Sequence, residues 1–317
     1  MYLFQEISLR DINRIFQKAL DTDLIREARL LEGGLFNTSY YVSYGPHRQE
    51  AVLRLGPVNR QLLMGHEHGL MAAAAWICQT CAAQGLPCSQ VLALDCSREV
   101  VDRDYMIAAY IPSSAMSETA LTEPERESLF EQMGAYLRRL HQIEGSCFGY
   151  VSRILAGKGA SRWSEALLLE TEDILNRLET FQPVQQREAL LELFHRSQAL
   201  LDDAGVCRLL HTDLWEGNVL LDRESHKILA VIDGDRAVFG DPDFEFASSW
   251  MNHPALLRGY GMETNLSPQR WERRRLYQIY YCLLEGYVGF EKYGRPEEWE
   301  RSRQRMEMLL IQGSSFF

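Results

Sequence analysis

Lysine is almost absent from this chain, and acidic residues outnumber the basic residues as a whole. The only lysines are Lys18, Lys158, Lys227 and Lys292. In total 33 lysines and arginines face 44 aspartates and glutamates, which gives a net charge of −11. Proteins that bind duplex nucleic acid normally carry a basic stripe, because phosphate neutralisation dominates their affinity. We therefore expect no nucleic-acid partner, and the acidic balance is compatible with a small cationic substrate.

Long apolar runs and a signal-like start are also missing. The longest weakly polar run, GLMAAAAWIC from Gly69 to Cys78, is too short to span a bilayer. The opening residues, MYLFQEISLRDINRIF, contain acids and lack the basic segment that precedes the apolar stretch of a signal peptide. We therefore expect a cytoplasmic protein with no membrane partner.

Cysteine spacing does not form a clear metal-binding motif. Among the seven cysteines, Cys78 and Cys81 make a C-x-x-C that could indicate zinc or redox chemistry. These two lie in an alanine-rich helical stretch, and Cys88 and Cys96 do not complete a second such pair. Buried thiols that act as small apolar residues are the favoured interpretation, with zinc as the alternative.

The first third of the chain alternates short strands with turns. Residues 9–20 have apolar positions at helical spacing. Residues 26–56 alternate, are rich in Tyr and Val, and contain two glycine turns, which predicts three antiparallel strands joined by hairpins. A helix at residues 66–85 and strands at 88–95 and 104–112 complete a five-stranded, largely antiparallel sheet with one helix against it.

After Pro112 the helical patterns take over. Thr122 is a candidate N-cap for a long amphipathic helix. Further helices are predicted at residues 161–180, 186–205 and 274–294, and short strands at 206–210, 218–222 and 227–233. The expected fold class is α+β, with a strand-rich N-terminal domain at residues 1–112 and a helical C-terminal domain at residues 113–317.

One stretch, HTDLWEGNVLLDRESHKILAVIDGDRA from residue 211 to 237, sets polar residues between apolar runs. Asp213 and Asn218 are five residues apart around a glycine turn, and Asp233 follows fifteen residues later at the end of an apolar strand. Carboxylate and carboxamide oxygens are ligands that Mg²⁺ accepts, and a carboxylate outside the metal shell can take a proton from an attacking hydroxyl. A polar loop of purely structural origin is the alternative, which the number of matching positions disfavours.

The pattern H-x-D-x-x-x-x-N followed by a strand-end Asp occurs in protein kinases. Here it resembles more closely the aminoglycoside phosphotransferase (APH) family, a choline kinase-like group of small-molecule kinases. The segments that carry the resemblance are LRRLH, LLHTDLWEGNVLLD, AVIDGDRAVFGDPDFEFA, LEGGLFNTSYYV, AVLRLG and DYMIAAYIP. Thr212 stands where the family usually has glycine. The resemblance implies a two-lobe, protein-kinase-like fold, with a five-stranded antiparallel sheet and one helix before a mainly helical lobe.

This resemblance assigns roles to the matching residues. Asp213 is implied as the catalytic base that orients the substrate hydroxyl, and His211 as an architectural residue. The implied Mg²⁺ ligands are Asn218 and Asp233. The residues implied in nucleotide binding are Gly34 and Asn37 of the covering hairpin, Arg54 of the clamp strand, Glu67 as its ion-pair partner, and the backbone of Ala109 and Ile111 at the adenine.

A clamp lysine and a Walker-type loop are both missing. Lys18 is the only lysine before Pro112 and lies in the opening helix, so a phosphate clamp in this chain must be an arginine. Arginine is always charged and binds phosphate in a bidentate way, with a geometry different from that of lysine. No G-x-x-x-x-G-K-[S/T] occurs, which excludes a P-loop.

Some neighbouring polar residues carry more than one interpretation. Asp235 could touch a second metal ion or cap the next turn, whereas Asp241 is favoured as a helix cap. Glu245 is expected to fix the loop against the following helix, and together with Asp243 it is a candidate for contact with a substrate amine. Four tyrosines at positions 277–287 could line a pocket, but their helical spacing favours the core.

The resemblance implies a phosphotransferase that uses Mg²⁺ and ATP or GTP to phosphorylate a hydroxyl of a small molecule. An antibiotic such as an aminoglycoside is the first expectation. A metabolic kinase for choline, a fructosamine or homoserine is the alternative, and LLHTDLWEGN resembles the fructosamine kinases, where a tryptophan also follows H-x-D-L. A pseudokinase that binds nucleotide without turnover is disfavoured, because Asp213, Asn218 and Asp233 are all present.

Overall fold

The computed structural model describes residues 3–31, 36–180, 183–262 and 266–313. These residues form two compact units, each assembled from segments that are distant in sequence. The strand-rich unit comprises Met1–Leu63, Glu67–Thr119 and Glu216–Arg236, and the helical unit comprises Met64–His66, Ala120–Trp215 and Ala237–Phe317. The strand-rich unit therefore continues past residue 112, where the sequence predicts its end, and it includes a segment from the second half of the chain.

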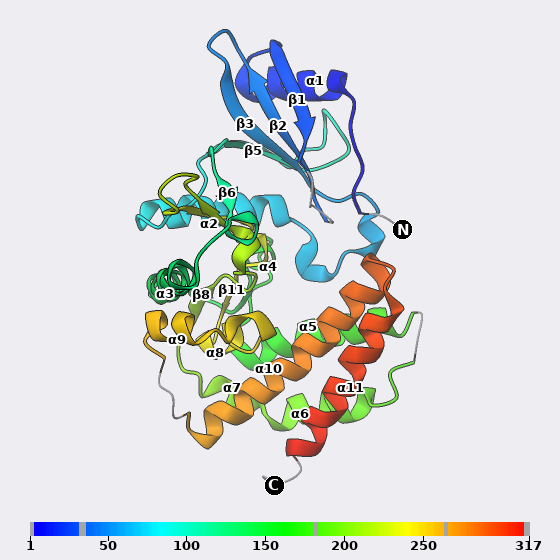
Figure 1. The fold of residues 1–317 in the computed structure, drawn as a ribbon. Helices are drawn as coiled ribbons and strands as arrows, with labels where there is room; N and C mark the ends of the chain where they lie inside the picture. The colour runs from blue at the N-terminus through cyan, green and yellow to red at the C-terminus, as the bar shows by residue number, and fades with distance from the viewer. Residues whose placement is uncertain (1–2, 32–35, 181–182, 263–265, 314–317) are drawn as a thin grey trace. The chain divides into compact units, whose positions relative to one another are not determined.

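The strand-rich unit is built on a five-stranded antiparallel sheet, as the sequence predicts (Figure 1). Its strands are β1 (Ile25–Leu30), β2 (Thr38–Tyr44), β3 (Gln49–Leu55), β4 (Val91–Asp95) and β5 (Tyr105–Ala109). They lie in the order β1-β2-β3-β5-β4, so β3 is central. Arg54 of β3 lies opposite Ser39 of β2 and Met106 of β5, with a strand on each side.

Two helices cover the faces of this sheet. They are α1 (Leu9–Leu20) and α2 (Leu70–Ala83). Phe16 of α1 belongs to one buried cluster with Ile107, and Met71 of α2 belongs to another with Met106. Since neighbouring residues of a strand point to opposite faces, these contacts place the two helices on opposite sides of β5.

Helix α2 begins four residues later than the predicted helix at residues 66–85. Gly69, at its N-cap, has φ 86°, a left-handed conformation that glycine adopts at no steric cost. Before it, Gly65–Glu67 form a 3₁₀ turn. Because the left-handed residue breaks the helical path, Glu67 lies outside α2.

A three-stranded sheet carries the returning segment of the strand-rich unit. Its strands, in spatial order, are β10 (Ile228–Val231), β9 (Val219–Leu221) and β6 (Ser114–Ala115). The Val231 N–H donates to the Pro87 carbonyl at 3.1 Å, which attaches the end of β10 to the segment before β4. The chain then passes Asp233 and makes a 3₁₀ turn, Gly234–Arg236, against α2.

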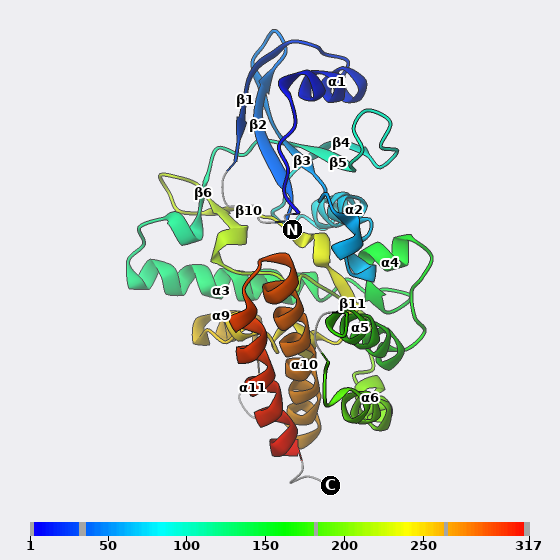
Figure 2. The same cartoon turned by 90° about the vertical axis from the view of Figure 1, so that its right-hand side faces the viewer.

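The helical unit contains the remaining helices. They are α3 (Glu123–Leu140), α4 (Val151–Leu155), α5 (Trp163–Leu178), α6 (Arg187–Arg196), α7 (Gln198–Asp202), α8 (Pro242–Glu245), α9 (Pro254–Tyr260), α10 (Pro268–Tyr287) and α11 (Pro296–Gly313). Figures 1 and 2 both show α10 and α11 packed side by side. In the part of the chain described, none of the helices combines the length and apolar character that a membrane crossing needs.

The prediction of one continuous helix at residues 186–205 is wrong. The structure divides it into α6 and α7 at Ser197, which has φ −88° and ψ 3°. Serine is a weak helix former, because its hydroxyl competes for backbone hydrogen bonds. The predicted core position of the tyrosines of α10 is confirmed, since Tyr277, Tyr280, Tyr281 and Tyr287 are all buried.

A small sheet in the helical unit supports the loop that contains Asp213. Its strands, in spatial order, are β7 (Gly149–Tyr150), β11 (Val238–Gly240) and β8 (Arg208–Leu210), and all pairs are antiparallel. Leu209 and Leu210 are fully buried, so β8 is fixed in the core directly before His211.

Candidate active site

Arg54 is the centre of a charged cluster in the strand-rich unit. Its side chain is 15% exposed, and its Nη2 group contacts the Asp233 carboxylate and donates to Asp235 Oδ2 at 2.9 Å. One guanidinium nitrogen thus serves two carboxylates through charge-assisted hydrogen bonds, which are stronger than neutral ones. Together with Asn37, these residues form what we name the Arg54 cluster (Arg54, Asn37, Asp233 and Asp235).

Asp235 is the more deeply buried carboxylate of the cluster. Burial and, after it, the negative charge of Asp233 raise the pKa of Asp235 above its usual value. Asn37 donates from Nδ2 to Asp235 Oδ2 at 3.3 Å and is only 7% exposed. Within the described residues, Asn37 Oδ1 is buried and has no hydrogen-bond partner. An unsatisfied acceptor beside two carboxylates is a favourable place for a cation or a ligand donor.

Glu67 is not the partner of Arg54 that the sequence predicts. In the described part of the chain, Arg54 pairs with the two aspartates, and the Glu67 carboxylate lies 3.6 Å from Nη2 of Arg236. The Arg236 guanidinium also lies 5.2 Å from the centre of the Phe36 ring. The late start of α2 gives a physical reason, since it leaves Glu67 in a 3₁₀ turn rather than on the helix.

The residues predicted to meet adenine lie at the end of β5, where Ala109 is the last residue of the strand and Ile111 follows it. The Ala109 N–H donates to the Gln90 carbonyl at 2.8 Å, and the Ile111 carbonyl accepts from Ser113 Oγ at 2.8 Å. The amide of Ala109 is therefore already used within the protein, and an adenine contact there would have to use its carbonyl group. Gly34 lies outside the described residues.

Asn218 lies next to the Arg54 cluster through the backbone. It is buried, and its carbonyl accepts the Ile232 N–H at 2.9 Å, one residue before Asp233. Its carboxamide and the two carboxylates are oxygen donors of the kind that Mg²⁺ prefers. The convergence of Asp233 and Asp235 on the cation of Arg54 fits such an ion. Since the described residues hold no ready group of three His, Cys, Asp or Glu ligands, phosphate oxygens would have to complete the coordination.

In the helical unit, buried Glu245 holds the loop that presents Asp213. Its carboxylate accepts the His211 N–H at 2.7 Å and the Thr212 N–H at 2.9 Å. Thr212 has φ 64°, a left-handed conformation that costs a residue with a Cβ about 1 kcal/mol or more. The two hydrogen bonds stabilise this turn, so the predicted role of Glu245 in fixing the loop is confirmed.

The Asp213 side chain is only partly buried, and its backbone is supported by His211. The Asp213 N–H donates to His211 Nδ1 at 3.3 Å, so in this arrangement the histidine proton resides on Nε2. His211 is buried, which agrees with an architectural role. Burial raises the pKa of Tyr281 well above its usual value, and the charge of Asp213 is one of the weaker contributions. Tyr281 therefore stays neutral.

Asp243 does not meet the expectation that it contacts a substrate amine. Its carboxylate lies 2.8 Å from Arg270, 2.9 Å from Arg274 and 3.6 Å from Arg273. Burial alone would raise the pKa of Asp243, but the hydrogen bond from Arg270 and the charge of Arg274 lower it. Glu245 is likewise engaged, by two backbone N–H groups, so both acids have partners inside the protein.

Asp241 is a helix cap, as the sequence predicts. Its side chain accepts the Asp243 N–H at 2.9 Å at the start of α8. The same carboxylate accepts from Tyr277 at 2.7 Å and from Arg273 at 3.0 Å. These bonds attach α8 to α10.

Three tryptophans of the helical unit, Trp215, Trp250 and Trp271, are exposed and were not among the predicted site residues. Trp215, two residues after Asp213, is 47% exposed. Trp250 is 36% exposed, and its ring centre lies 6.2 Å from that of Tyr281. A tryptophan offers a ligand a flat apolar face and one N–H donor. The tryptophan directly after H-T-D-L was the only sequence signal for Trp215.

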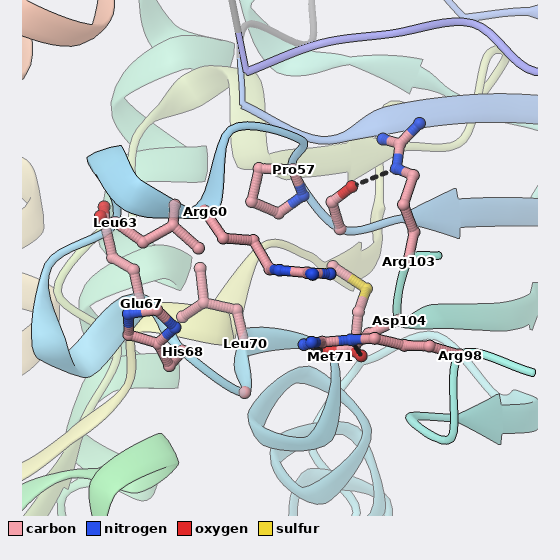
Figure 3. A pocket seen from close by; sticks show the side chains of 12 residues that line it. Pro57, Arg60, Leu63, Glu67, His68, Leu70, Met71, Arg98, Arg103 and Asp104 are labelled. Atoms are coloured by element: carbon pink, nitrogen blue, oxygen red, sulfur yellow. Dashed lines mark hydrogen bonds and ion pairs between the residues drawn. The ribbon is translucent and has the colours of Figure 1, made fainter. Parts of the chain in front are cut away.

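A small hollow of about 20 Å³ opens elsewhere in the strand-rich unit, beside the start of α2 (Figure 3). Arg103 lines it and donates from Nε to the Gly56 carbonyl at 2.6 Å, which Figure 3 marks with a dashed line. The lining includes Glu67 but neither Arg54 nor Asp233. We therefore assign this hollow no part in the chemistry of the Arg54 cluster.

Comparison with known proteins adds information on ancestry. Residues 27–277 match the sequence model of the phosphotransferase enzyme family (APH). A probable ketoamine kinase of Lactiplantibacillus plantarum is 22% identical over 283 residues, which cover 85% of this chain and 91% of that protein. A probable ketoamine kinase of Enterococcus faecium is 31% identical over 116 residues, which cover 35% of this chain and 40% of that protein.

Solved structures share the fold at low sequence identity. A thermostable variant of aminoglycoside phosphotransferase APH(4)-Ia, in a ternary complex with AMP-PNP and hygromycin B, has a TM-score of 0.66 at 18% identity, covering 96% of this chain and 99% of that chain. A protein described as a fructosamine-3-kinase from Thermobifida fusca has a TM-score of 0.63 at 18% identity, covering 92% and 99%. The predicted kinase-like fold is thereby confirmed.

Proposed function

Because this chain belongs to the phosphotransferase enzyme family (APH) of small-molecule kinases, we propose that it transfers the γ-phosphate of ATP or GTP to a hydroxyl group of a ketoamine. The observation that supports the phosphotransferase chemistry is the pair of hydrogen bonds by which the Glu245 carboxylate fixes the loop that contains Asp213. A base fixed in this way can orient a hydroxyl group without reorganisation during the reaction.

The strand-rich unit binds the nucleotide in this proposal. Asn218 and Asp233 would hold Mg²⁺, whose charge offsets the charge of the phosphates. Arg54 contacts phosphate oxygens through its planar fork of donors. The residues that we assign to nucleotide binding are Arg54, Glu67, Gly34, Asn37, Ala109 and Ile111.

Asp213 acts on the acceptor. Its carboxylate accepts a hydrogen bond from the substrate hydroxyl and directs the oxygen at the γ-phosphorus. As the new P–O bond forms, the bond from the γ-phosphorus to the bridging oxygen of the nucleotide breaks, the hydroxyl proton passes to Asp213, and the nucleoside diphosphate leaves. Most of the catalytic effect then comes from positioning and charge stabilisation.

Trp215 favours a ketoamine as the acceptor. Its exposed ring lies on the same loop as Asp213, where it can stack on the carbon face of a sugar and attract a protonated amine through a cation–π contact. Asp243 is neutralised by arginines, so it does not offer a free carboxylate to a polycation. The two curated relatives are probable ketoamine kinases, which supports the same substrate class.

An aminoglycoside is the second candidate. The observation that favours it is the acidic balance of the chain, a net charge of −11, which would attract a polycationic substrate. The two candidates differ in what they require near Asp213, because an aminoglycoside needs several free carboxylates, whereas a ketoamine needs one flat apolar face and one hydroxyl contact.

A direct transfer assay tests the proposal. Purified protein is incubated with Mg²⁺, ATP or GTP, and separate acceptors that include a fructose-derived ketoamine of lysine, an aminoglycoside, choline and homoserine. Mass spectrometry then detects added phosphate, with the Asp213→Ala protein as control. We expect phosphate on the ketoamine with the wild-type protein alone. Phosphate on the aminoglycoside alone would replace the first candidate by the second, and nucleotide binding without transfer to any acceptor would contradict both.

A further inference from the structure

The Arg54 cluster carries more negative than positive charge. Asp233 and Asp235 supply two carboxylates against one guanidinium, and both approach the same Nη2 atom. Asn37 adds an amide N–H and no formal charge. The next cation along the chain, Arg236, lies 3.6 Å from Glu67. With both aspartates ionised, the four residues of the cluster have a net charge of −1.

Arg54 occupies the position that a metal ion would also need. Asp233 Oδ1 and Asp235 Oδ2 converge on its Nη2 atom, so a divalent cation bound between these two oxygens would take the place of that nitrogen. A guanidinium and a divalent cation at this one place would repel each other. The buried Asn37 Oδ1 is a further oxygen in the cluster that Arg54 does not use.

Arg54 is also able to leave these carboxylates without a change of backbone. Its backbone is held between two neighbouring strands, so only the side chain has to move. The guanidinium sits at the end of a flexible stem, and the side chain is 15% exposed. Phosphate oxygens would offer it the same bidentate geometry that carboxylates do.

We propose that a divalent cation displaces Arg54 from Asp233 and Asp235, and that metal binding thereby frees Arg54 to bind the nucleotide phosphates. This inference rests on the proposed kinase function. Arg54 is then a positioning residue with two successive sets of partners. Before the metal binds, its charge offsets the repulsion between buried Asp235 and partly exposed Asp233. Afterwards it is available as the phosphate clamp. The metal and Arg54 compete for the same oxygens in the nucleotide-free protein.

Mn²⁺ binding to the nucleotide-free protein tests this competition without nucleotide or acceptor. Free Mn²⁺ is titrated by electron paramagnetic resonance against wild-type protein, Arg54→Met, Arg54→Lys and the control Arg60→Met. Arg60 is an exposed arginine of the same unit, paired with Asp102, so the control removes one positive charge away from the cluster. We expect Arg54→Met to bind Mn²⁺ about tenfold or more tightly than wild type, since a competing cation is gone.

Arg54→Lys keeps the charge but replaces the planar fork by a single ammonium group, so a smaller gain is expected. Arg60→Met should match wild type. Thermal unfolding provides a second measurement, because Mn²⁺ should raise the Tm of Arg54→Met more than that of wild type. This measurement remains informative if Arg54→Met is less stable, since the shift is taken within each variant.

Unchanged or weaker Mn²⁺ binding in both Arg54 variants would overturn the proposal. An equal gain in Mn²⁺ affinity in Arg54→Met and Arg60→Met would also overturn it, because the gain would then come from the change in net charge alone. These outcomes are separate from failure of the proposed function. A wild-type protein that transfers no phosphate in the acceptor assay would contradict the function, whatever its affinity for Mn²⁺.

Discussion

The two units hold the carboxylates of their candidate sites in different ways. In the strand-rich unit, Asp233 and Asp235 are held by side chains, chiefly that of Arg54, with Asn37 as a second donor to Asp235. In the helical unit, Glu245 is held by the backbone N–H groups of His211 and Thr212. A side-chain partner can be exchanged for a metal ion or a phosphate, whereas a backbone partner cannot leave without unfolding the loop. The difference indicates an exchangeable ligand site in one unit and a fixed support in the other.

The largest expected effect is the loss of phosphate transfer on mutation of Asp213, which tests whether the two units have separate functions. Asp213→Ala removes the proposed base, so phosphate transfer should fall by about 10³-fold or more, while nucleotide affinity stays within a few-fold of wild type. Transfer is followed by mass spectrometry and nucleotide binding by calorimetry. Asp213→Asn, which keeps the shape, should behave in the same way. Loss of nucleotide binding in parallel with transfer would show that Asp213 is a structural residue.

The complementary change breaks the exchangeable site. Asp233→Ala should weaken Mg²⁺-dependent nucleotide binding by about 10- to 100-fold, because a metal ligand is lost. Asp233 has φ 65°, so Asp233→Asn, which tolerates the left-handed backbone, is the safer second variant. Glu224→Ala, at an exposed acid of the same unit, is the control. Metal dependence that survives in both Asp233 variants would show that the ligand assignment is wrong.

A change in Glu245 tests the fixed support. In Glu245→Gln one carboxylate oxygen becomes an N–H₂ group that faces a backbone donor, so the free energy of unfolding should fall by about 2 kcal/mol. The kcat should drop by about tenfold, with nucleotide affinity little changed. Chemical denaturation and steady-state kinetics measure both effects, with Glu127→Gln on α3 as an exposed control. A wild-type kcat in a destabilised Glu245→Gln variant would mean that catalysis does not depend on the hydrogen bonds from this loop to Glu245.

The smallest expected effect concerns the strain at Thr212. Thr212→Gly should raise the free energy of unfolding by about 0.5–1 kcal/mol, because glycine adopts φ 64° without a Cβ clash and loses only part of that gain to chain entropy. Thr212→Ala keeps the Cβ and should bring no gain. Denaturation curves of the two variants give the comparison. Equal stability of both would show that the support from Glu245 leaves no strain at this position.

The elements of the fold were mostly predictable, because the periodicity of apolar residues is a local property. The five-stranded sheet, α1 at residues 9–20 and the buried tyrosines of α10 all follow from spacing. Two of the differences between prediction and structure occur where one residue changes the backbone direction, and a third is the helix predicted at residues 274–294, which is observed as α10 followed by a π-helical segment, Val288–Lys292. Gly69 delays the start of α2, and Ser197 divides the helix predicted at residues 186–205. Neither residue is a decisive helix breaker by type alone.

The candidate site was predictable only in part. The residue types and spacing of Asp213, Asn218 and Asp233 are enough to indicate metal and base chemistry. The partner of Arg54 was not predictable from spacing, since it lies 179 residues away in sequence and either Glu67 or an aspartate could have filled that position. The choice depends on whether Glu67 lies on α2 or before it.

By itself, the sequence determined the family, most of the strands and helices and the absence of a clamp lysine, and it singled out the oxygen-bearing residues that we propose as metal ligands. These features depend on residue type and local spacing, so they can be read without knowing which distant residues are in contact. Only the tertiary structure decided that Arg54 binds Asp233 and Asp235, that arginines neutralise Asp243, and that Glu245 supports the loop of Asp213 through the N–H groups of His211 and Thr212. Each of these pairings joins residues that are distant in sequence, and burial makes the choice of partner energetically decisive.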